Sequence, residues 1–189
     1  RFLLRDRALR TLVLAVVVAA LAASAANAII SLYAIQTLAI RVALVPTLWA
    51  VQAVGTLIAA ALVPRLATRF GEGRVMVGAL SLLGVAFLAV GAIPVAGAVW
   101  TAYLLVGAGA GGWNVLSATR RQRLTPRRLM GRVTSAYRML AWGLMPLGAA
   151  LAGPLADGTS LATVFVVVGG VVTVAAVTLA RPLIRTGAT

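Results

Sequence analysis

The sequence contains no cysteine, histidine or lysine, and its only carboxylates are Asp6, Glu72 and Asp157. Without cysteine there are no disulfides or thiolate nucleophiles, and without histidine there are no imidazole bases or usual zinc ligands. An acid pair at a catalytic site would have to come from residues far apart in the sequence. These absences argue against an enzyme, and we expect no catalytic residues, no metal and no other cofactor.

Apolar residues, by contrast, make up 62% of the 189 residues, more than in a soluble globular domain. A helix needs about 20 apolar residues to cross roughly 30 Å of hydrocarbon. Several uncharged stretches reach this length, and the longest, residues 75–119, holds two spans around the turn signal GAIPVAGAV. The sequence therefore predicts an all-α membrane protein, with one domain of six transmembrane helices over residues 1–189. The predicted spans are about 11–36, 43–63, 75–93, 98–118, 137–156 and 161–180.

The arginines are divided unequally between the two sides of this predicted bundle. Six spans place both termini on one side. That side receives Arg1, Arg5, Arg7, Arg10, Arg65, Arg69, Arg74, Arg120, Arg121, Arg123, Arg127, Arg128, Arg132, Arg138, Arg181 and Arg185. The other side receives only Arg41. Because cytoplasmic loops carry the excess of basic residues, we expect a multi-pass protein with both termini in the cytoplasm. The exclusive use of arginine and the many alanines point to a bacterium, and so to its plasma (inner) membrane.

The densest basic segment, ATRRQRLTPRRLMGRVTS at residues 118–135, carries six arginines. A nucleic-acid surface would place aromatic residues between them for base stacking, and there are none, so we expect no nucleic-acid partner. The segment instead fixes the topology and lies against the lipid bilayer. Thr125 and Pro126 suit the start of a helix. Apolar residues at 129, 130, 133, 137 and 140 predict a short amphipathic helix on the cytoplasmic surface before the fifth span.

Polar side chains inside the spans are concentrated in the first, second, fourth and fifth. Such residues usually face a bundle interior or a cavity, because lipid does not solvate them. We infer that these four spans line a polar cavity, whereas the third and sixth support them or face lipid. The candidates for contact with a small-molecule substrate are Asn27, Ser31, Gln52, Asn114, Tyr137, Arg138 and Trp142. The amides have an alternative role in hydrogen bonds between helices, and Arg138 could instead reach the membrane interface.

Two features of the spans concern packing. The glycines of GAGAGG, residues 107–112, lie within an apolar span and predict a close approach between helices, not a dinucleotide site. Pro146 is expected to kink or loosen the fifth span.

The chain resembles, over essentially its whole length, the C-terminal six-helix half of a Major Facilitator Superfamily transporter. Residues 64–74, PRLATRFGEGR, form the predicted loop between the second and third spans. This loop is similar to the cytoplasmic signature G-x-x-x-D-R-x-G-R-R, which Arg69, Gly71 and Arg74 fit approximately. Pro64, Thr68 and Glu72 depart from it, so the role of the signature's acid is not transferred. The motif P-x-x-L-x-G-R-V, with Pro126, Gly131 and Arg132, followed by W-G-x-x-P-L-G, resembles the bacterial enterobactin-exporter and macrolide-efflux branch. Residues 1–10 resemble the linker helix that enters the seventh span.

This resemblance implies an antiporter that exports amphipathic drugs, macrolides or siderophores by alternating access. Its partner would be an N-terminal six-helix half or a second copy of this chain. In the superfamily, helices seven, eight, ten and eleven line the cavity, which agrees with the distribution of polar residues. No predicted span contains a carboxylate, so a proton-titrating acid would belong to the other half or a partner. The alternative is a stand-alone six-helix protein, acting as a scaffold or as a half-transporter that must dimerise.

Overall fold

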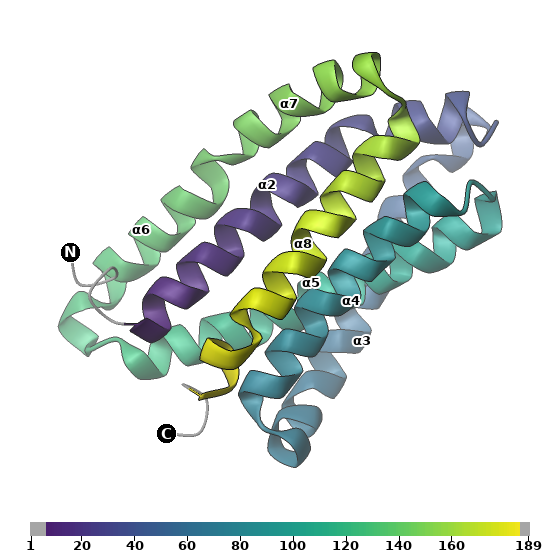
Figure 1. The fold of residues 1–189 in the computed structure, drawn as a ribbon. Coiled ribbons are helices and arrows are strands. Elements are labelled where there is room, and N and C mark those ends of the chain that lie inside the picture. Colours follow the sequence, from purple (N-terminus) through teal and green to yellow (C-terminus); the bar gives the residue numbers. More distant parts are fainter. Residues whose placement is uncertain (1–6, 186–189) are drawn as a thin grey trace.

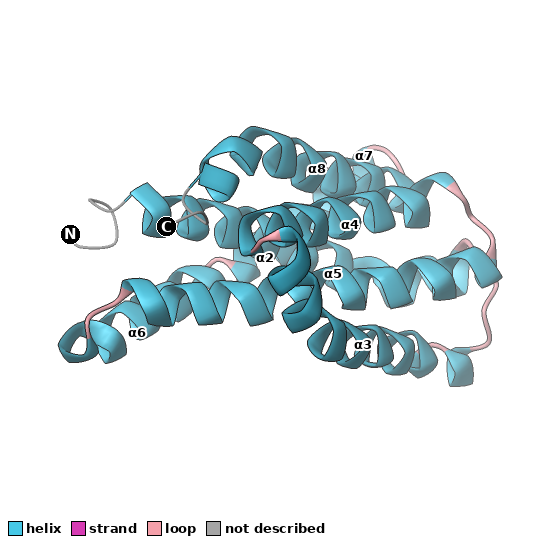
Figure 2. Ribbon diagram, turned by 90° about the horizontal axis from the view of Figure 1, so that it is seen from below, coloured by secondary structure: helices cyan, strands magenta, loops and turns pink. Residues whose placement is uncertain are grey.

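A computed structural model describes residues 7–185, and this part of the chain is helical with short connections (Figures 1 and 2). Its long helices are α2 (Arg7–Gln36), α3 (Pro46–Phe70), α4 (Glu72–Ala92), α5 (Ala96–Leu124) and α8 (Leu161–Arg185). The fifth predicted span is formed by two helices in succession, α6 (Met130–Gly143) and α7 (Met145–Gly158). Short 3-10 turns, η1 (Val42–Leu44) and η2 (Arg127–Leu129), precede α3 and α6. Most of the linker-helix motif at residues 1–10 lies outside the described residues.

The prediction of an all-α membrane protein is confirmed. Five segments of the described chain are long and apolar enough to cross a membrane: Leu9–Gln36, Val42–Phe70, Glu72–Ala92, Arg127–Gly158 and Leu161–Arg185. Helix α5 has 29 residues, but its glycines, Tyr103, Trp100 and Trp113 make it less apolar than the others. It packs between α3 and α4 and contributes many buried residues. The number of membrane crossings stays a prediction, although a helix occupies each predicted position.

The bundle is held together by a sequence of close helix pairs. Helix α4 packs along α8, α2 contacts α8 and α7, and α5 contacts α3 and α4. Tyr33 of α2 joins three of these helices, because its hydroxyl donates to the carbonyl oxygen of Val90 on α4 at 2.8 Å and its ring lies 5.0 Å from that of Phe165 on α8. Helices in lipid associate mainly through such packing and hydrogen bonds, since burial of apolar surface gives little gain there.

The α3–α5 contact depends on glycine, as the sequence predicts for residues 107–112. A Cβ atom at Gly107 would lie 2.8 Å from the carbonyl carbon of Gln52 and closer still to its oxygen. The two backbones therefore touch at this point. The Thr56 hydroxyl donates to the carbonyl oxygen of Gly107 at 3.1 Å across the same contact. Close packing between helices is confirmed here, and it places Gln52 beside α5.

Residues 64–74, which were expected to form a loop, are almost entirely helical. Helix α3 continues through Pro64 to Phe70, and α4 begins at Glu72. A proline blocks only one backbone hydrogen bond, and helices in membranes tolerate that loss. Gly71 is the single joint between the two helices, and its φ of 87° is a conformation that suits glycine. The loop prediction was wrong for this segment.

The expectation of a separate surface helix before the fifth span was also wrong. Helix α5 runs six residues beyond its predicted end at 118, and α6 begins at Met130 and continues into the span. The break comes later, at Leu144, where α6 ends and α7 starts with Pro146 in its first turn. Because Pro146 has no N–H, the helical hydrogen bonds cannot run unbroken through it. The predicted interruption of the fifth span at this proline is confirmed.

Candidate functional site: a polar cavity between α2, α3, α5 and α6

A cavity of about 450 Å³ brings together six of the seven candidate residues. Asn27 comes from α2, Gln52 from α3 and Asn114 from α5, whereas α6 contributes Tyr137, Arg138 and Trp142. Helix α4 adds only apolar side chains, and α8 adds none to the lining. The volume lies within the range of about 300–1,000 Å³ that is common for small-molecule sites.

Ser31 is the candidate that does not line this cavity. It lies about one helical turn beyond Asn27 on α2, and it is exposed outside the lining. Ser24, on the other side of Asn27, is buried and donates to the carbonyl oxygen of Leu21 at 3.0 Å within its own helix. Of the three polar residues at helical spacing on α2, only Asn27 therefore faces the cavity.

The polar part of the wall follows one face of α5. Asn114, Ser117 and Arg121 are spaced at three and four residues and so lie on the same side of the helix. On the other wall, Tyr137, Arg138, Ala141 and Trp142 lie on one side of α6. Residues 137 and 141, and likewise 138 and 142, are four residues apart and so about one helical turn from each other. Two helix faces with helical periodicity thus oppose each other, and both carry hydrogen-bonding groups.

Two arginines give the cavity a positive charge. The Arg121 guanidinium lies over the Tyr137 ring, 3.9 Å from its centroid, and that of Arg138 lies 5.7 Å from the Trp142 ring. Among the described residues, no carboxylate lines the cavity. Glu72 is at the start of α4, paired with Arg123, and Asp157 is exposed in the last turn of α7. Nothing acidic on the described helices therefore neutralises the cavity.

Several donors in the wall lack acceptors. The Nε1 atom of Trp113, the Nε and Nη1 atoms of Arg121 and the hydroxyl of Tyr137 are buried, and none has a hydrogen-bond partner among the described residues. Ser117, Trp113 and Arg121 lie close enough to the Tyr137 hydroxyl for weak hydrogen-bonding interactions, but none of these contacts has the distance and angle of a normal hydrogen bond. The side-chain amides of Asn27, Gln52 and Asn114 likewise form no hydrogen bond between helices in the described chain.

Sequence analysis missed Arg121 and Trp113 as site residues. Arg121 was assigned to a basic loop because the fourth span was expected to end at residue 118. Once α5 is extended to Leu124, the spacing of seven residues between Asn114 and Arg121 places both on the cavity face. The signal was present in the sequence, but the position of the helix end concealed it.

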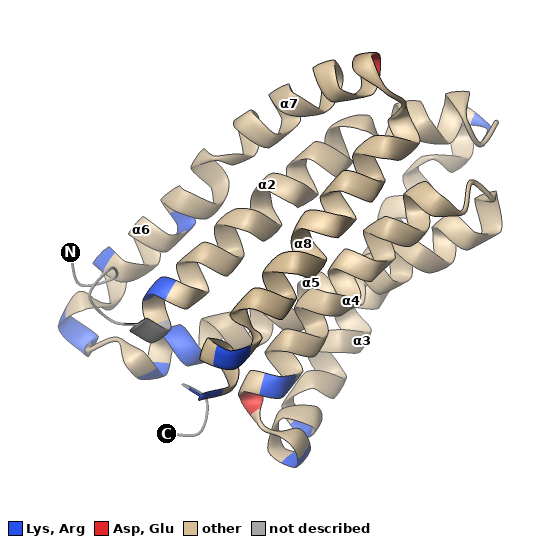
Figure 3. Cartoon of the chain, viewed as in Figure 1, with Lys and Arg blue, Asp and Glu red and all other residues tan. Residues whose placement is uncertain are grey.

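Most described arginines lie at the end of the bundle where α3 meets α4 and α5 leads to α6, whereas Arg41 lies at the opposite end (Figure 3). We call the first the arginine-rich end. It holds the candidate signature residues Arg69, Gly71, Arg74, Pro126, Gly131 and Arg132, all of which are exposed. None of these six lines the polar cavity.

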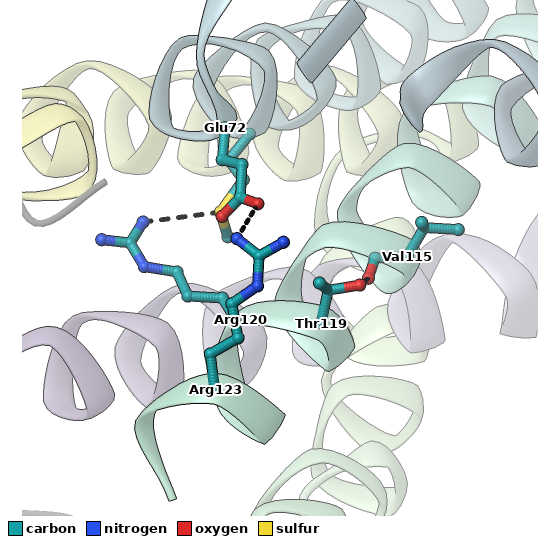
Figure 4. Close-up of polar contacts among 6 residues, drawn as sticks. Glu72, Val115, Thr119, Arg120 and Arg123 are labelled. Carbon is teal, nitrogen blue, oxygen red and sulfur yellow. Dashed lines mark hydrogen bonds and ion pairs between the residues drawn. The ribbon is translucent and has the colours of Figure 1, made fainter. Parts of the chain in front are cut away.

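Polar contacts of α5 join it to α4 and α8 at the arginine-rich end, and the sequence analysis did not predict them (Figure 4). Arg123 forms an ion pair with Glu72 at the start of α4, with an N–O distance of 2.5 Å. The buried Arg120 donates to the carbonyl oxygen of Leu183 on α8 at 3.0 Å and approaches the Met76 sulfur at 3.6 Å. These bonds tie the last turns of α5 to α4 and α8, while Arg121 between them turns to the cavity.

Comparison with known proteins identifies one family. The family model of the Major Facilitator Superfamily matches residues 2–188. No curated protein matches the chain. The family match covers both the polar cavity and the arginine-rich end.

Proposed function

Since the chain belongs to the Major Facilitator Superfamily, whose members are membrane transporters of small molecules and not enzymes, we propose that it is the C-terminal six-helix half of an exporter. Its substrates would be amphipathic small molecules of the drug, macrolide or siderophore type, moved by alternating access. The observation that carries this proposal is the cavity of about 450 Å³, which lies among membrane-length helices and is lined by hydrogen-bonding groups.

The state of the lining residues supports a role in substrate contact. Asn27, Gln52 and Asn114 have no hydrogen bonds to other helices in the described chain, so their amides remain available to a solute. Polar groups at membrane depth are costly unless they serve a cavity or a pathway. Trp142 and Arg138 add an aromatic surface and a charge at the same wall. An amphipathic molecule can use all three kinds of contact.

The division of the fifth span into α6 and α7 supports alternating access. Broken helices are common where transporters move, because few backbone hydrogen bonds resist bending at the break. The break at Leu144 comes two residues after Trp142, at one end of the cavity lining. Movement of α6 about this point would change the width of the cavity.

The orientation follows from charge. The arginine-rich end would face the cytoplasm of a bacterium, with the chain in the inner membrane and both termini on the cytoplasmic side. Its exposed arginines suit contact with anionic lipid headgroups. The opposite end, with Arg41 and the exposed Asp157, would face outward.

The assignment to the C-terminal half rests on the resemblance of Pro126, Gly131, Arg132 and the following W-G-x-x-P-L-G motif to the exporter branch. The partner would be an N-terminal half or a second copy of this chain. A stand-alone scaffold is the alternative. Proton antiport would need an acid outside this cavity, since no described carboxylate lines it.

An efflux assay on the complete gene, expressed in a bacterium that lacks its main drug exporters, tests the proposal. Asn114→Leu and Gln52→Leu should change which amphipathic compounds are exported, while the amount of protein in the membrane stays the same. Gln122→Leu is the control, because this exposed residue lies on the same helix as Asn114 but outside the cavity. Export that is unchanged in both cavity variants would contradict the substrate role.

A further inference from the structure

We propose that the Arg121 end of the cavity binds the anionic group of the transported molecule, so that the substrate is an amphipathic organic anion. This inference rests on the proposed function and adds a substrate class to it. The site consists of Arg121 and Trp113 on α5 and Tyr137 on α6. Its ligand group would be a carboxylate, sulfonate or similar oxyanion with several acceptor atoms.

The first argument is the unused hydrogen-bonding capacity of the site. Trp113 is 3% exposed and Tyr137 is 7% exposed, and the polar atoms of both lack acceptors in the described chain. The Nε and Nη1 atoms of Arg121 lack them too. All of these groups can donate, and an oxyanion suits them because it offers several acceptor sites and its negative charge strengthens each hydrogen bond. Buried donors without acceptors are costly, so a ligand that accepts from them is favoured.

The second argument is charge. An arginine side chain carries a positive charge, and no described acid shares the cavity with Arg121. Arg138 adds a second positive charge to the same lining. Between membrane helices a charge is poorly screened, so an anion is attracted and a cation is repelled more strongly than at an aqueous surface. The cavity therefore selects against amphipathic cations.

The third argument is preorganisation. The Tyr137 ring supports the Arg121 guanidinium from one side at 3.9 Å, which limits the orientations of this long side chain. The Nε and Nη1 atoms of Arg121 are buried in the cavity wall, so the guanidinium already occupies the position in which it would meet a ligand. A guanidinium that is already held in place loses less conformational entropy when it binds an oxyanion.

The rest of the cavity fits the apolar body of such a molecule. Ala19 and Ala23 of α2, Leu83 and Phe87 of α4 and Val106 of α5 form an apolar wall in the same lining. The amides of Asn27, Gln52 and Asn114 offer additional contacts to polar substituents. A charged group at one end and a hydrophobic wall beside it are the features that recognise an amphipathic anion.

Two dyes that share one aromatic body test the inference. The sulfonate 8-anilinonaphthalene-1-sulfonate and the neutral N-phenyl-1-naphthylamine differ by the anionic group. Their binding is measured by fluorescence to the complete protein in lipid nanodiscs, with empty nanodiscs subtracted. Arg121→Gln should weaken binding of the sulfonate by about tenfold or more, since loss of one charged hydrogen bond of ~1.4 kcal/mol corresponds to tenfold. Binding of the neutral dye should change less than about twofold.

Arg128→Gln is the matched control, because it removes the same charge from an exposed residue outside the cavity. It should leave binding of both dyes unchanged. Tyr137→Phe is a second test that keeps the ring beneath Arg121 and removes only the hydroxyl. It should weaken the sulfonate alone, by a smaller factor than Arg121→Gln. It also keeps the inference testable if Arg121→Gln does not fold.

Three results would overturn the inference. If Arg121→Gln and Arg128→Gln weaken binding of the sulfonate dye equally, the dye is attracted by the positive charge of the protein as a whole and not by the cavity. Loss of both dyes in Arg121→Gln alone would show that this residue maintains the cavity's shape. Equal binding of both dyes by the unaltered protein, with a lower melting temperature in Arg121→Gln, would show that Arg121 stabilises the protein and does not recognise the anionic group. If the unaltered protein neither binds nor exports even the neutral dye, the exporter proposal itself fails.

Discussion

Removal of the hydroxyl group is expected to have opposite effects on stability at two buried tyrosines. Tyr33 on α2 and Tyr103 on α5 are both 0% exposed, but only the Tyr33 hydroxyl has a hydrogen-bond acceptor, the carbonyl oxygen of Val90 at 2.8 Å. That carbonyl would normally accept from the residue four positions later, which is Pro94 and has no N–H. Tyr33 thus supplies the donor that the proline just after α4 cannot.

Tyr33→Phe should therefore leave a buried carbonyl without a partner, in a region where water does not readily replace it. The expected cost is about 1–3 kcal/mol in the free energy of unfolding, the usual penalty for an unsatisfied buried polar group. Tyr103→Phe removes a hydroxyl that is already buried without a partner among the described residues. Its edge-on contact with Trp49 keeps the ring in place. Stability should stay the same or increase.

Unfolding in mixed detergent micelles, followed by circular dichroism and extrapolated linearly, measures both variants under the same conditions. The stability of Tyr33→Phe should fall below that of Tyr103→Phe by about 1–3 kcal/mol. Equal values for the two variants, or a greater loss in Tyr103→Phe, would refute the argument that Tyr33 compensates for Pro94.

Three further predictions concern packing, surface charge and the broken helix. Gly107→Ala should lower the free energy of unfolding by about 1–3 kcal/mol because α3 and α5 must separate, whereas Gly97→Ala on the same helix, which has open space, should be close to neutral. Glu72→Gln should cost less than about 1 kcal/mol, because its partner Arg123 is 68% exposed; a larger loss in the same unfolding assay would contradict this. Pro146→Ala should slow transport while thermal stability is kept, and an unchanged transport rate would show that the break does not need the proline.

The sequence was sufficient to predict the helical membrane class and much of the cavity lining, because both follow from strong local patterns. Long uncharged stretches gave the helix positions. Asn27, Gln52 and Asn114 lie in different helices, yet all three meet at one cavity. Polar residues are costly in lipid, so a polar residue within an apolar span indicates a position facing the bundle interior or a cavity. This holds even when the packing of the helices is not known.

Helix ends were the part that could not be predicted. Pro64 was taken as the start of a loop, but α3 passes through it and turns only at Gly71. At residue 118, a run of arginines was taken as the end of a helix, although arginine is a good helix former and the helix continues to Leu124. Charge marks where a chain leaves the hydrocarbon, and this is not the same as where the helix stops.

The helix continues beyond the apolar stretch, and for this reason the position of Arg121 in the cavity was not predicted. Arg120, Arg121 and Arg123 look alike in the sequence, but on a continuing helix they point in three directions. Arg120 reaches Leu183, Arg123 reaches Glu72, and Arg121 lines the cavity. Only the rotation of α5 relative to its neighbours separates these roles, and that rotation is set by contacts far apart in the sequence, such as Gly107 against Gln52.

The central claim, that the polar cavity is a route for small molecules through the membrane, is tested most directly by access of water-soluble reagents to Asn114. The chain has no cysteine, so a single one can be introduced without removing any from it. The account predicts that Asn114→Cys reacts in intact membranes with a charged thiol reagent, because the thiolate forms only where water reaches it. Val174→Cys, on the exposed surface of α8, should not react, since lipid would cover it. Labelling of Asn114→Cys that is no faster than that of Val174→Cys would contradict the account.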